Sequence, residues 1–287
     1  MSEKVFLNDK IIDNEKANLS VTDSGFLYGA GLFETMRSYN GKVFSLDDHL
    51  DRLFFSANAL SIKIDNERKF ISDSIYNLLD ANSLTDARLR LTVSSGSMSL
   101  SQENKQATML ITATQLQPYP KEYYEKGVLV TLCPYRQNTN DPTCGHKTTS
   151  YFSRMLALQN AHQKGAAEAL WFTTDNKLAE GCVSNVFLVK DSKVFTPPLY
   201  TPVLAGIARK TICKLAMSNT IELVEKDLNI NDVIGADEIF LTNVIMQVMP
   251  VVQVEQHVVN KGIVGETTKL LIDKYNELVG NKPLNNE

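Results

Sequence analysis

The sequence has few cysteines and no spacing that would favour a metal site. Its cysteines are Cys133, Cys144, Cys182 and Cys213, and they form no Cys-x-x-Cys pair. Neither a disulfide framework nor a zinc site is therefore indicated, and a reducing cytoplasm is the simpler expectation. The histidines also lie far apart along the chain, so we expect no metal centre.

Long apolar runs and an excess of one charge sign are missing as well. The most apolar stretch, 239–254, is interrupted by Thr242, Asn243 and Gln247, and it falls short of the roughly 18 apolar residues that a membrane helix needs. The first residues contain too short an apolar run for a secretory leader. The formal net charge is −4 with both signs interspersed, which gives no electrostatic footprint for nucleic acid. We expect a soluble, cytoplasmic protein that acts on a small molecule, without nucleic-acid or membrane partners.

The length and the local patterns indicate an α+β protein of two domains. The chain has 287 residues, of which 43% are hydrophobic, enough for two modest cores. Asn40-Gly41 between β-prone runs predicts a hairpin, since both residues tolerate positive φ. Ser45 predicts a helix N-cap, with Asp48 three residues later completing a capping pattern. We expect helices at about 45–60, 67–80, 150–163, 208–217 and 265–278, and strands at about 5–7, 10–12, 33–39, 88–93, 109–114, 128–133, 169–173, 186–189 and 193–196.

A domain boundary is expected near Pro118 and Pro120. The stretch 115–121 has no periodicity, and its prolines cannot donate backbone hydrogen bonds. We therefore predict a smaller N-terminal α+β domain at 1–116, an interdomain linker at 117–124 and a larger C-terminal α+β domain at 125–287.

Two motifs point to chemistry. Lys147 lies in Cys144-Gly-His-Lys-Thr-Thr-Ser-Tyr151, and Glu180 follows 33 positions later in Ala179-Glu-Gly-Cys-Val-Ser-Asn-Val-Phe187. An amine that bonds the cofactor and an acid that pairs with its ring nitrogen are the groups that pyridoxal phosphate chemistry needs most. Taken singly, each residue would be read as a solvated surface charge.

Both motifs resemble the lysine and glutamate motifs of the class IV aminotransferase family, the fold type IV pyridoxal phosphate enzymes. Four more segments resemble this family in the same order along the chain: 29–37, 49–53, 204–209 and 236–251. The resemblance implies two α+β domains with the D-amino acid aminotransferase-like fold, a homodimer with its active site near the interface, and a small-molecule amino substrate. A fold that is kept only for binding, without catalysis, is a remote alternative.

The resemblance also implies roles for individual residues. Lys147 would bond the cofactor and move the substrate proton, and Glu180 would hold the ring nitrogen protonated. Arg52 would bind the phosphate, although a helix-surface arginine that neutralises Asp48 is the plainer interpretation. The remaining expected cofactor contacts are Tyr151 on the ring oxygen, Leu204 on the ring, Ile207 and Ala208 at a helix N-terminus, and Asn243. Leu204 as an ordinary core leucine is nearly as good an interpretation, and the family usually has threonine where this chain has Ala208.

The choice of reaction depends on residues far from Lys147. Thr35 occupies a position where branched-chain aminotransferases generally have glycine and aminodeoxychorismate lyases have a threonine that assists proton transfer. Thr242-Asn243-Val244 resembles the loop of those lyases, although a turn asparagine explains Asn243 equally well. Ser95 stands where D-amino acid aminotransferases have an arginine.

The resemblance therefore predicts a 4-amino-4-deoxychorismate lyase that forms 4-aminobenzoate, a folate precursor, and pyruvate. A class IV amino acid aminotransferase, of the branched-chain or D-amino acid type, is the alternative, because the same lysine and acid would serve it. Catalysis is assigned to Lys147 and Thr35. Substrate binding is assigned to Arg37 and Asn243, with Arg136 as a further candidate from its position.

Overall fold

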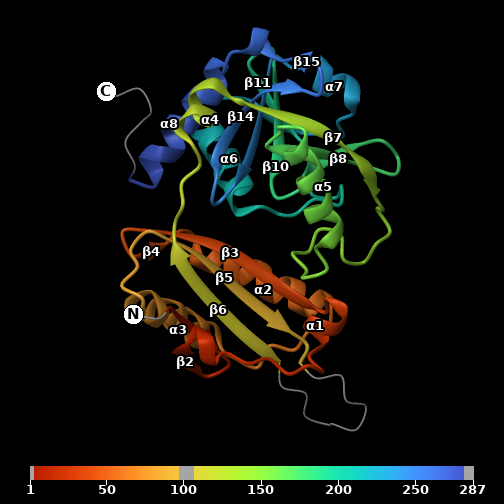
Figure 1. Ribbon diagram of the computed structural model, residues 1–287. Helices are drawn as coiled ribbons and strands as arrows, with labels where there is room; N and C mark the ends of the chain where they lie inside the picture. Colours follow the sequence, from red (N-terminus) through yellow and green to blue (C-terminus); the bar gives the residue numbers. More distant parts are fainter. Residues whose placement is uncertain (1–2, 97–106, 281–287) are drawn as a thin grey trace. The chain divides into compact units, whose positions relative to one another are not determined.

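The computed structural model describes residues 3–96 and 107–280, which form two compact units (Figure 1). The first unit contains Met1–Gln117 with His146–Tyr151, and the second contains Pro118–Gly145 with Phe152–Glu287. The segment around Lys147 thus belongs to the first unit, whereas the sequence placed it in the C-terminal domain. The stretch 117–124, expected as a linker, overlaps a short helix, α4 (Lys121–Lys126). Helices combined with sheets in both units confirm the α+β class.

The first unit is built on an antiparallel sheet. Its elements in the described residues are β1 (Lys4–Leu7), β2 (Lys10–Asp13), η1 (Asn14–Lys16), α1 (Ser24–Tyr28), β3 (Gly31–Tyr39), β4 (Lys42–Val43), α2 (Leu46–Ala59), α3 (Arg68–Ala81), β5 (Ala87–Ser94) and β6 (Thr108–Gln115). The strands lie in the order β2-β1-β6-β5-β3-β4, and every neighbouring pair is antiparallel. The hairpin predicted around Asn40-Gly41 is therefore confirmed, and the strands expected at 5–7 and 10–12 pair with each other.

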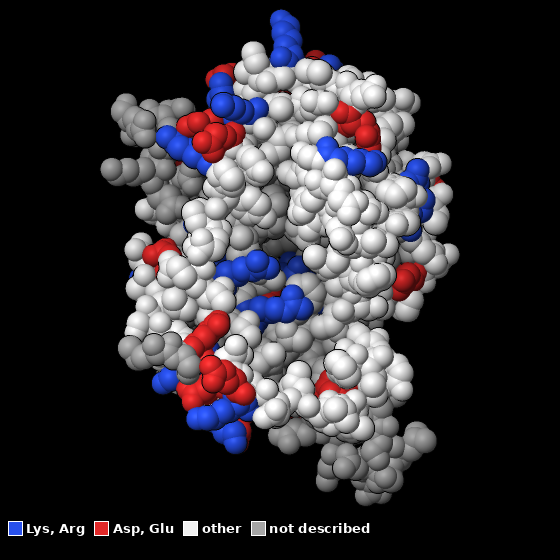
Figure 2. Space-filling view, viewed as in Figure 1, with Lys and Arg blue, Asp and Glu red and all other residues white. Residues whose placement is uncertain are grey.

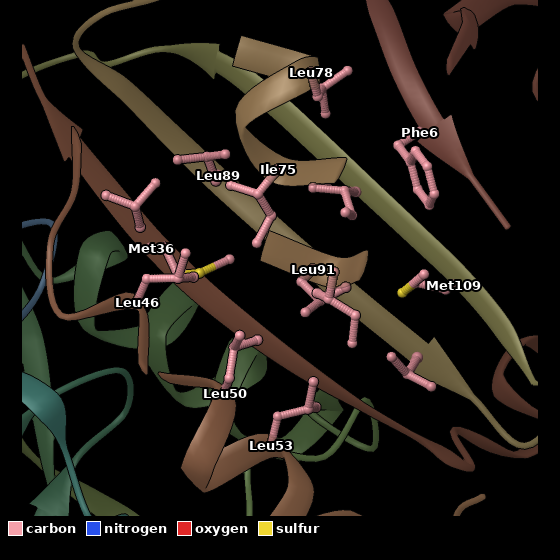
Figure 3. Packing of buried hydrophobic residues seen from close by; sticks show 14 of the residues in the cluster. Phe6, Met36, Leu46, Leu50, Leu53, Ile75, Leu78, Leu89, Leu91 and Met109 are labelled. Carbon is pink, nitrogen blue, oxygen red and sulfur yellow. The ribbon is translucent and has the colours of Figure 1, made fainter. Parts of the chain in front are cut away.

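Helices α2 and α3 pack on one face of this sheet. Strand side chains alternate between faces, so Leu32 and Met36 of β3 point toward the helices together with Leu89 and Leu91 of β5. The resulting core is shown in Figure 3, where the labelled side chains are Phe6, Met36, Leu46, Leu50, Leu53, Ile75, Leu78, Leu89, Leu91 and Met109. The opposite face of the sheet carries the alternate residues of the same strands, among them Phe33, Thr35 and Arg37 of β3.

The start of α2 differs from the predicted cap in its chemistry. Ser45 is the N-cap residue as expected, but its side chain makes no cap hydrogen bond. The reason is its backbone conformation, φ 48° and ψ 43°, because N-cap side chains reach the first turn from extended backbone. Asp47 and Asp48 in the first turn still favour this helix end through its dipole.

The second unit is built on a mixed sheet. Its further elements in the described residues are β7 (Val128–Gln137), α5 (Phe152–Gln163), β8 (Glu168–Thr173), β9 (Leu178–Gly181), β10 (Asn185–Lys190), β11 (Lys193–Thr196), α6 (Ile207–Ser218), β12 (Leu223–Glu225), α7 (Ile230–Ile234), β13 (Glu238–Asn243), β14 (Gln247–Val254), β15 (His257–Val258), η2 (Asn260–Gly262) and α8 (Glu266–Leu278). The order is β12-β11-β10-β13-β14-β7-β8-β9, with β15 on β14. Strand β7 is parallel to both of its neighbours, β14 and β8.

Charged side chains of both signs are scattered over the face shown in Figure 2. Within the described ranges, no helix is long and apolar enough to cross a membrane. The same residues contain no group of three or more His, Cys, Asp or Glu side chains that could hold a metal ion. All of the cysteines are free thiols.

Candidate active site

The segment that contains Lys147 pairs with the beginning of β3 like a short extra strand. The Phe33 N–H donates to the Lys147 carbonyl at 2.9 Å, and the Thr149 N–H donates to the Gly31 carbonyl at 2.9 Å. Thr148 forms an isolated antiparallel bridge with Leu32. These backbone bonds explain why α5 begins at Phe152, two residues later than the sequence predicted.

Two glycines permit this close approach. Gly29 has φ +67°, and a Cβ there would lie 3.1 Å from the Ser150 Cα. A Cβ on Gly31 would lie 2.7 Å from the Val93 carbonyl oxygen and 3.0 Å from the Thr149 hydroxyl. Side chains at these positions would push the Lys147 segment away from β3.

The side chain of Lys147 lies against two aromatic rings. Its Nζ is 4.5 Å from the ring centroid of Phe33 and 5.8 Å from that of Tyr151. The two rings meet edge to face, with their centroids 5.4 Å apart. This packing limits the directions open to the amine and brings Lys147 and Tyr151 together.

Thr35 lies on the same face of β3 as Phe33, because the two residues are separated by one position. Directly across on β5, Thr35 is paired with Arg90 and Arg37 with Arg88. Arg90 stacks on Phe33, with its guanidinium carbon 3.8 Å from the ring centroid, and its Nε donates to the Thr92 hydroxyl at 3.1 Å. The lysine, the threonine and the arginines therefore belong to one face of one sheet.

This face is strongly basic. Within the described strands β3, β5 and β6, none of the residues on it is acidic. Burial, followed by the neighbouring charge of Arg88, lowers the pKa of Arg90. Like charges directly opposite each other destabilise a sheet, so the pairing of Arg37 with Arg88 is not explained by stability. Such an arrangement suits an anionic ligand.

The opposite face of β3 holds a buried charge cluster around Glu34. Arg52 of α2 donates two hydrogen bonds to Glu34, from Nε to Oε1 at 2.9 Å and from Nη2 to Oε2 at 2.5 Å. His49 Nδ1 is 2.7 Å from Glu34 Oε2. Burial raises the pKa of Glu34, but the charge of Arg52 and the hydrogen bonds from His49 and Arg52 outweigh it and lower the pKa to about 2. Arg52 is thus a positioned, largely buried residue and not a freely solvated one, with its side chain 10% exposed.

Glu180 is buried in the second unit at β9. Its Oε1 accepts a hydrogen bond from Arg154 Nη2 at 2.5 Å, and its Oε2 accepts one from the Leu204 N–H at 3.0 Å. Asn185 Nδ2 lies 3.5 Å from Oε2 and also donates to the Leu204 carbonyl at 2.9 Å. The carboxylate is therefore held in one orientation by both of its oxygens.

The turn 204–206 leads from this carboxylate into α6. Gly206 is the N-cap, and a Cβ there would lie 2.0 Å from Asn185 Oδ1. The first-turn residues Ile207 and Ala208 are both buried. The N–H groups at a helix start have no partners within the helix, so this end of α6 offers donors to an anion.

The side chain of Asn243 is engaged by backbone. Its Oδ1 accepts the N–H groups of Ile245 and Met246, both at 2.9 Å, and its Nδ2 donates to the Val183 carbonyl at 3.1 Å. This is the turn geometry that the sequence weighed as an alternative. A ligand role would have to use its second amide hydrogen. Arg136, the other candidate from position, is exposed and donates to the carbonyls of Cys133 and Tyr135.

Sequence reasoning missed the partners of these residues. Glu34 could have been noticed, because it is a charged residue on the face of a β-strand that otherwise carries the buried apolar residues Leu32 and Met36. Arg154 could also have been noticed, because a basic residue at the start of a helix opposes the helix dipole. Asn185 and Arg90 gave no such indication, since Asn185 contacts Leu204 in a distant turn and Arg90 stacks on Phe33 of another strand.

Glu168 supports the turn that follows Glu180. Its oxygens accept the Cys182 N–H at 2.6 Å and the Val183 N–H at 3.0 Å. Burial raises the pKa of Glu168 to about 7, although these hydrogen bonds oppose the change. Burial and the nearby Glu168 carboxyl raise the pKa of Cys182 to about 12, so this thiol stays protonated.

Comparison with known proteins agrees with this arrangement. The family model for amino-transferase class IV matches residues 31–254. The chain belongs to the class IV aminotransferase family. A putative branched-chain-amino-acid aminotransferase from Methanocaldococcus jannaschii is 34% identical over 278 residues, covering 96% of each chain. Aminodeoxychorismate lyase from Bacillus subtilis is 31% identical over 283 residues, covering 96% of this chain and 95% of the relative.

A solved structure extends the agreement to the fold. The branched-chain amino acid aminotransferase of Escherichia coli matches with a TM-score of 0.92 at 25% identity, covering 99% of this chain and 97% of that one. This likeness confirms the fold type IV architecture. Class IV aminotransferases use pyridoxal phosphate, so the chain is a pyridoxal phosphate-dependent enzyme, as its motifs predicted.

The residues of each unit fit this cofactor. The first unit offers a lysine amine beside aromatic rings and an arginine oriented by a buried acid. The second offers a buried carboxylate and a helix start whose N-cap has no room for a side chain. These groups complement the aldehyde, the ring nitrogen and the phosphate of pyridoxal phosphate.

The buried Glu168 predicts a pH-dependent stability. Its pKa is about 7 in the folded chain against an ordinary value of 4.5, so between these values the folded state holds one more proton than the unfolded state. The contribution of Glu168 to the free energy of unfolding is complete below pH 4.5. It falls as the pH rises to 7, by about 3 kcal/mol in total. We expect Glu168→Gln to remove this slope from urea unfolding curves recorded between pH 4.5 and 8.

Other buried groups do not obscure this comparison. Glu34 has a pKa of about 2 in the folded chain, so its contribution to the free energy of unfolding is lost only when the pH falls below 4.5, its ordinary pKa. Burial lowers the pKa of His49, which gives a slope of the opposite sign, but this group is common to both proteins. If the difference in unfolding free energy between wild type and Glu168→Gln were the same at every pH, the titration of Glu168 would be disproved.

Proposed function

We propose that the chain is a pyridoxal phosphate-dependent 4-amino-4-deoxychorismate lyase that forms 4-aminobenzoate and pyruvate. The observation that supports it most is the position of Thr35, on the same sheet face as Phe33 and across from Arg90. A hydroxyl is thereby added to the basic face on which the Lys147 amine lies. The 31% identity to aminodeoxychorismate lyase of Bacillus subtilis also favours this function.

The cofactor contacts are proposed as follows. Lys147 bonds the cofactor, Glu180 faces its ring nitrogen, and Tyr151 contacts its ring oxygen. In the first unit, Arg52, oriented by Glu34, is the proposed phosphate ligand. In the second unit, the N–H groups of Ile207 and Ala208 are proposed phosphate donors. Leu204 and Asn243 complete the contacts, Leu204 also holding Glu180 through its backbone N–H.

In the proposed reaction the bound cofactor serves as an electron sink next to the substrate nitrogen. Lys147 removes the proton from the ring carbon that bears this nitrogen, and the Thr35 hydroxyl assists proton transfer at the departing group. The ring C–O bond breaks, the three-carbon group leaves and takes up a proton as pyruvate, and the ring becomes aromatic. Arg37 and Arg90 bind the two substrate carboxylates, for which a planar guanidinium is well shaped.

Amino transfer is the second candidate function. The relative from Methanocaldococcus jannaschii, named a putative branched-chain-amino-acid aminotransferase, is 34% identical to this chain. The basic face would equally receive the second carboxylate of a dicarboxylic amino acid or keto acid. Lys147 and Glu180 would have the same roles in this reaction. The two functions therefore differ in whether Thr35 assists proton transfer to a departing group.

The first experiment separates these functions directly. The purified holoenzyme is incubated with 4-amino-4-deoxychorismate without any keto acid, and in parallel with branched-chain or D-amino acids plus 2-oxoglutarate. We expect release of 4-aminobenzoate and pyruvate in equal amounts, because elimination needs no amino acceptor. Amino transfer without any release of 4-aminobenzoate would replace the lyase by the aminotransferase. Lys147→Ala, expected to lose the visible absorbance of the bound cofactor, serves as the inactive control.

A second experiment tests Thr35. We expect Thr35→Ala and Thr35→Gly to lower the lyase kcat by about a hundredfold, the usual loss when a proton-transfer group is removed. Thr35→Ser should keep most of the activity because it keeps the hydroxyl. Cofactor affinity, measured by absorbance titration, should stay the same in all three variants. Equal loss of cofactor binding and turnover would assign Thr35 to the cofactor and not to the elimination.

We also propose that the enzyme is a cytoplasmic homodimer. The N-terminal part of the first unit exposes large apolar side chains close together in sequence: Leu19 50%, Val21 77%, Phe26 72%, Leu27 47% and Tyr28 65%. A cluster of this kind favours burial against a partner, and a second copy is the partner that the family suggests. Light scattering should give twice the mass of one chain, and Phe26→Asp with Val21→Asp should reduce it to one. A monomeric wild type would contradict the proposal.

A further inference from the structure

Glu180 forms an ion pair with Arg154, a residue that has no role in the function proposed above. Arg154 Nη2 donates to Glu180 Oε1 at 2.5 Å, and its Nη1 donates to the Gly181 carbonyl at 3.1 Å. The two side chains are 19% and 5% exposed, so the pair is largely shielded from water. A shielded pair couples its two charges more strongly than a surface pair does.

The location of Arg154 indicates that this residue does not stabilise helix α5. Arg154 is in the first turn of α5, at the positive end of the helix dipole, where a basic residue is unfavourable. Its guanidinium carbon lies 5.4 Å from the ring centroid of Trp171, which limits its movement. Its interaction with Glu180 offsets the unfavourable position, and it leaves the carboxylate permanently beside a cation.

The other oxygen of Glu180 is fixed independently. The Leu204 N–H donates to Oε2 at 3.0 Å, and Asn185 Nδ2 is 3.5 Å away. Removing Arg154 would therefore change the charge around Glu180 while two of its neighbours still define its orientation. A carboxylate beside a cation is a weaker base than the same carboxylate alone, because the attraction stabilises its charged form.

We propose that Arg154 is a positioning residue that weakens the hold of Glu180 on the proton of the cofactor ring nitrogen. The inference rests on the proposed role of Glu180. With Arg154 beside it, Glu180 would hold a proton on the ring nitrogen less tightly than Glu180 alone would, and a bound cofactor would then withdraw electrons less strongly. This restraint favours elimination, in which the electrons leave with the departing group, over amino transfer, in which the ring must store them.

The test observes the ring nitrogen itself. The enzyme is loaded with pyridoxal phosphate labelled with 15N in the ring, and the 15N chemical shift is followed as a function of pH. We expect Arg154→Gln to raise the pH of half-protonation by about one unit. Arg154→Lys keeps the charge and should titrate within a few tenths of a unit of wild type. An Arg154→Gln protein that titrates like wild type would overturn the inference.

Control variants separate this outcome from a failure of the proposed function. Glu180→Gln should shift the nitrogen to its neutral form at pH 7; if it does not, the role of Glu180 and the inference are both wrong. If Glu180→Gln shifts the signal and Arg154→Gln does not, only the inference is wrong. Lys190→Gln, which breaks the exposed pair with Asp237 in the same unit, should titrate as wild type. Thermal melting of each protein checks folding, and Arg154→Met provides the same comparison should Arg154→Gln not fold.

Discussion

The backbone pairing of the Lys147 segment with β3 is the constraint on which the candidate site depends. The chain leaves the second unit at Gly145, passes through six residues of the first unit and returns at Phe152. Two hydrogen bonds, at Lys147 and Thr149, fix the register of these residues on β3. A slip of one residue would turn each side chain to the other face, so these bonds determine that the amine lies beside Phe33. The glycines at 29 and 31 make the register possible, because any side chain there would occupy the space of the segment.

Strand β3 divides its side chains by alternation between the face packed under the helices, which includes Glu34, and the basic face. One face contributes Leu32 and Met36 to the core under α2 and α3, whereas the other contributes Phe33, Thr35 and Arg37 to the basic surface. Changes on the chemical face therefore need not disturb the core. This arrangement allows the residue at position 35 to change while the core under α2 and α3 stays the same.

Features with a local cause were predictable from the sequence, and those with a non-local cause were not. Asn40-Gly41 specifies its own hairpin, and the motifs around Lys147 and Glu180 identified the cofactor without any structure. The location of the Lys147 segment in the first unit depends on bonds to β3, more than 100 residues earlier, which no local pattern encodes. Strand β14 was not predicted, and it contains Pro250, which cannot donate to a ladder; its pairing with β7 shows a register shift between Val251 and Gln253, just after the proline. The pairing of Glu180 with Arg154 and with the Leu204 N–H was hidden for the same reason, since both partners are distant from it in sequence.

Glu34 and Glu168 show how a buried carboxylate acquires its properties from its partners. Both are fully buried, and burial alone would raise both pKa values. Glu34 is next to the guanidinium of Arg52, and its pKa falls to about 2; Glu168 receives mainly backbone N–H groups, and its pKa rises to about 7. Neutral donors therefore do not compensate for lost hydration, whereas a cation does. Glu34 can orient Arg52 because its low pKa keeps it charged, and Glu168 can support the turn after Glu180 without adding a second full negative charge at pH values below its pKa of about 7. Glu180 combines both kinds of partner, one cation and two neutral donors. Its orientation comes from all three, and only Arg154 among them places a full charge beside it.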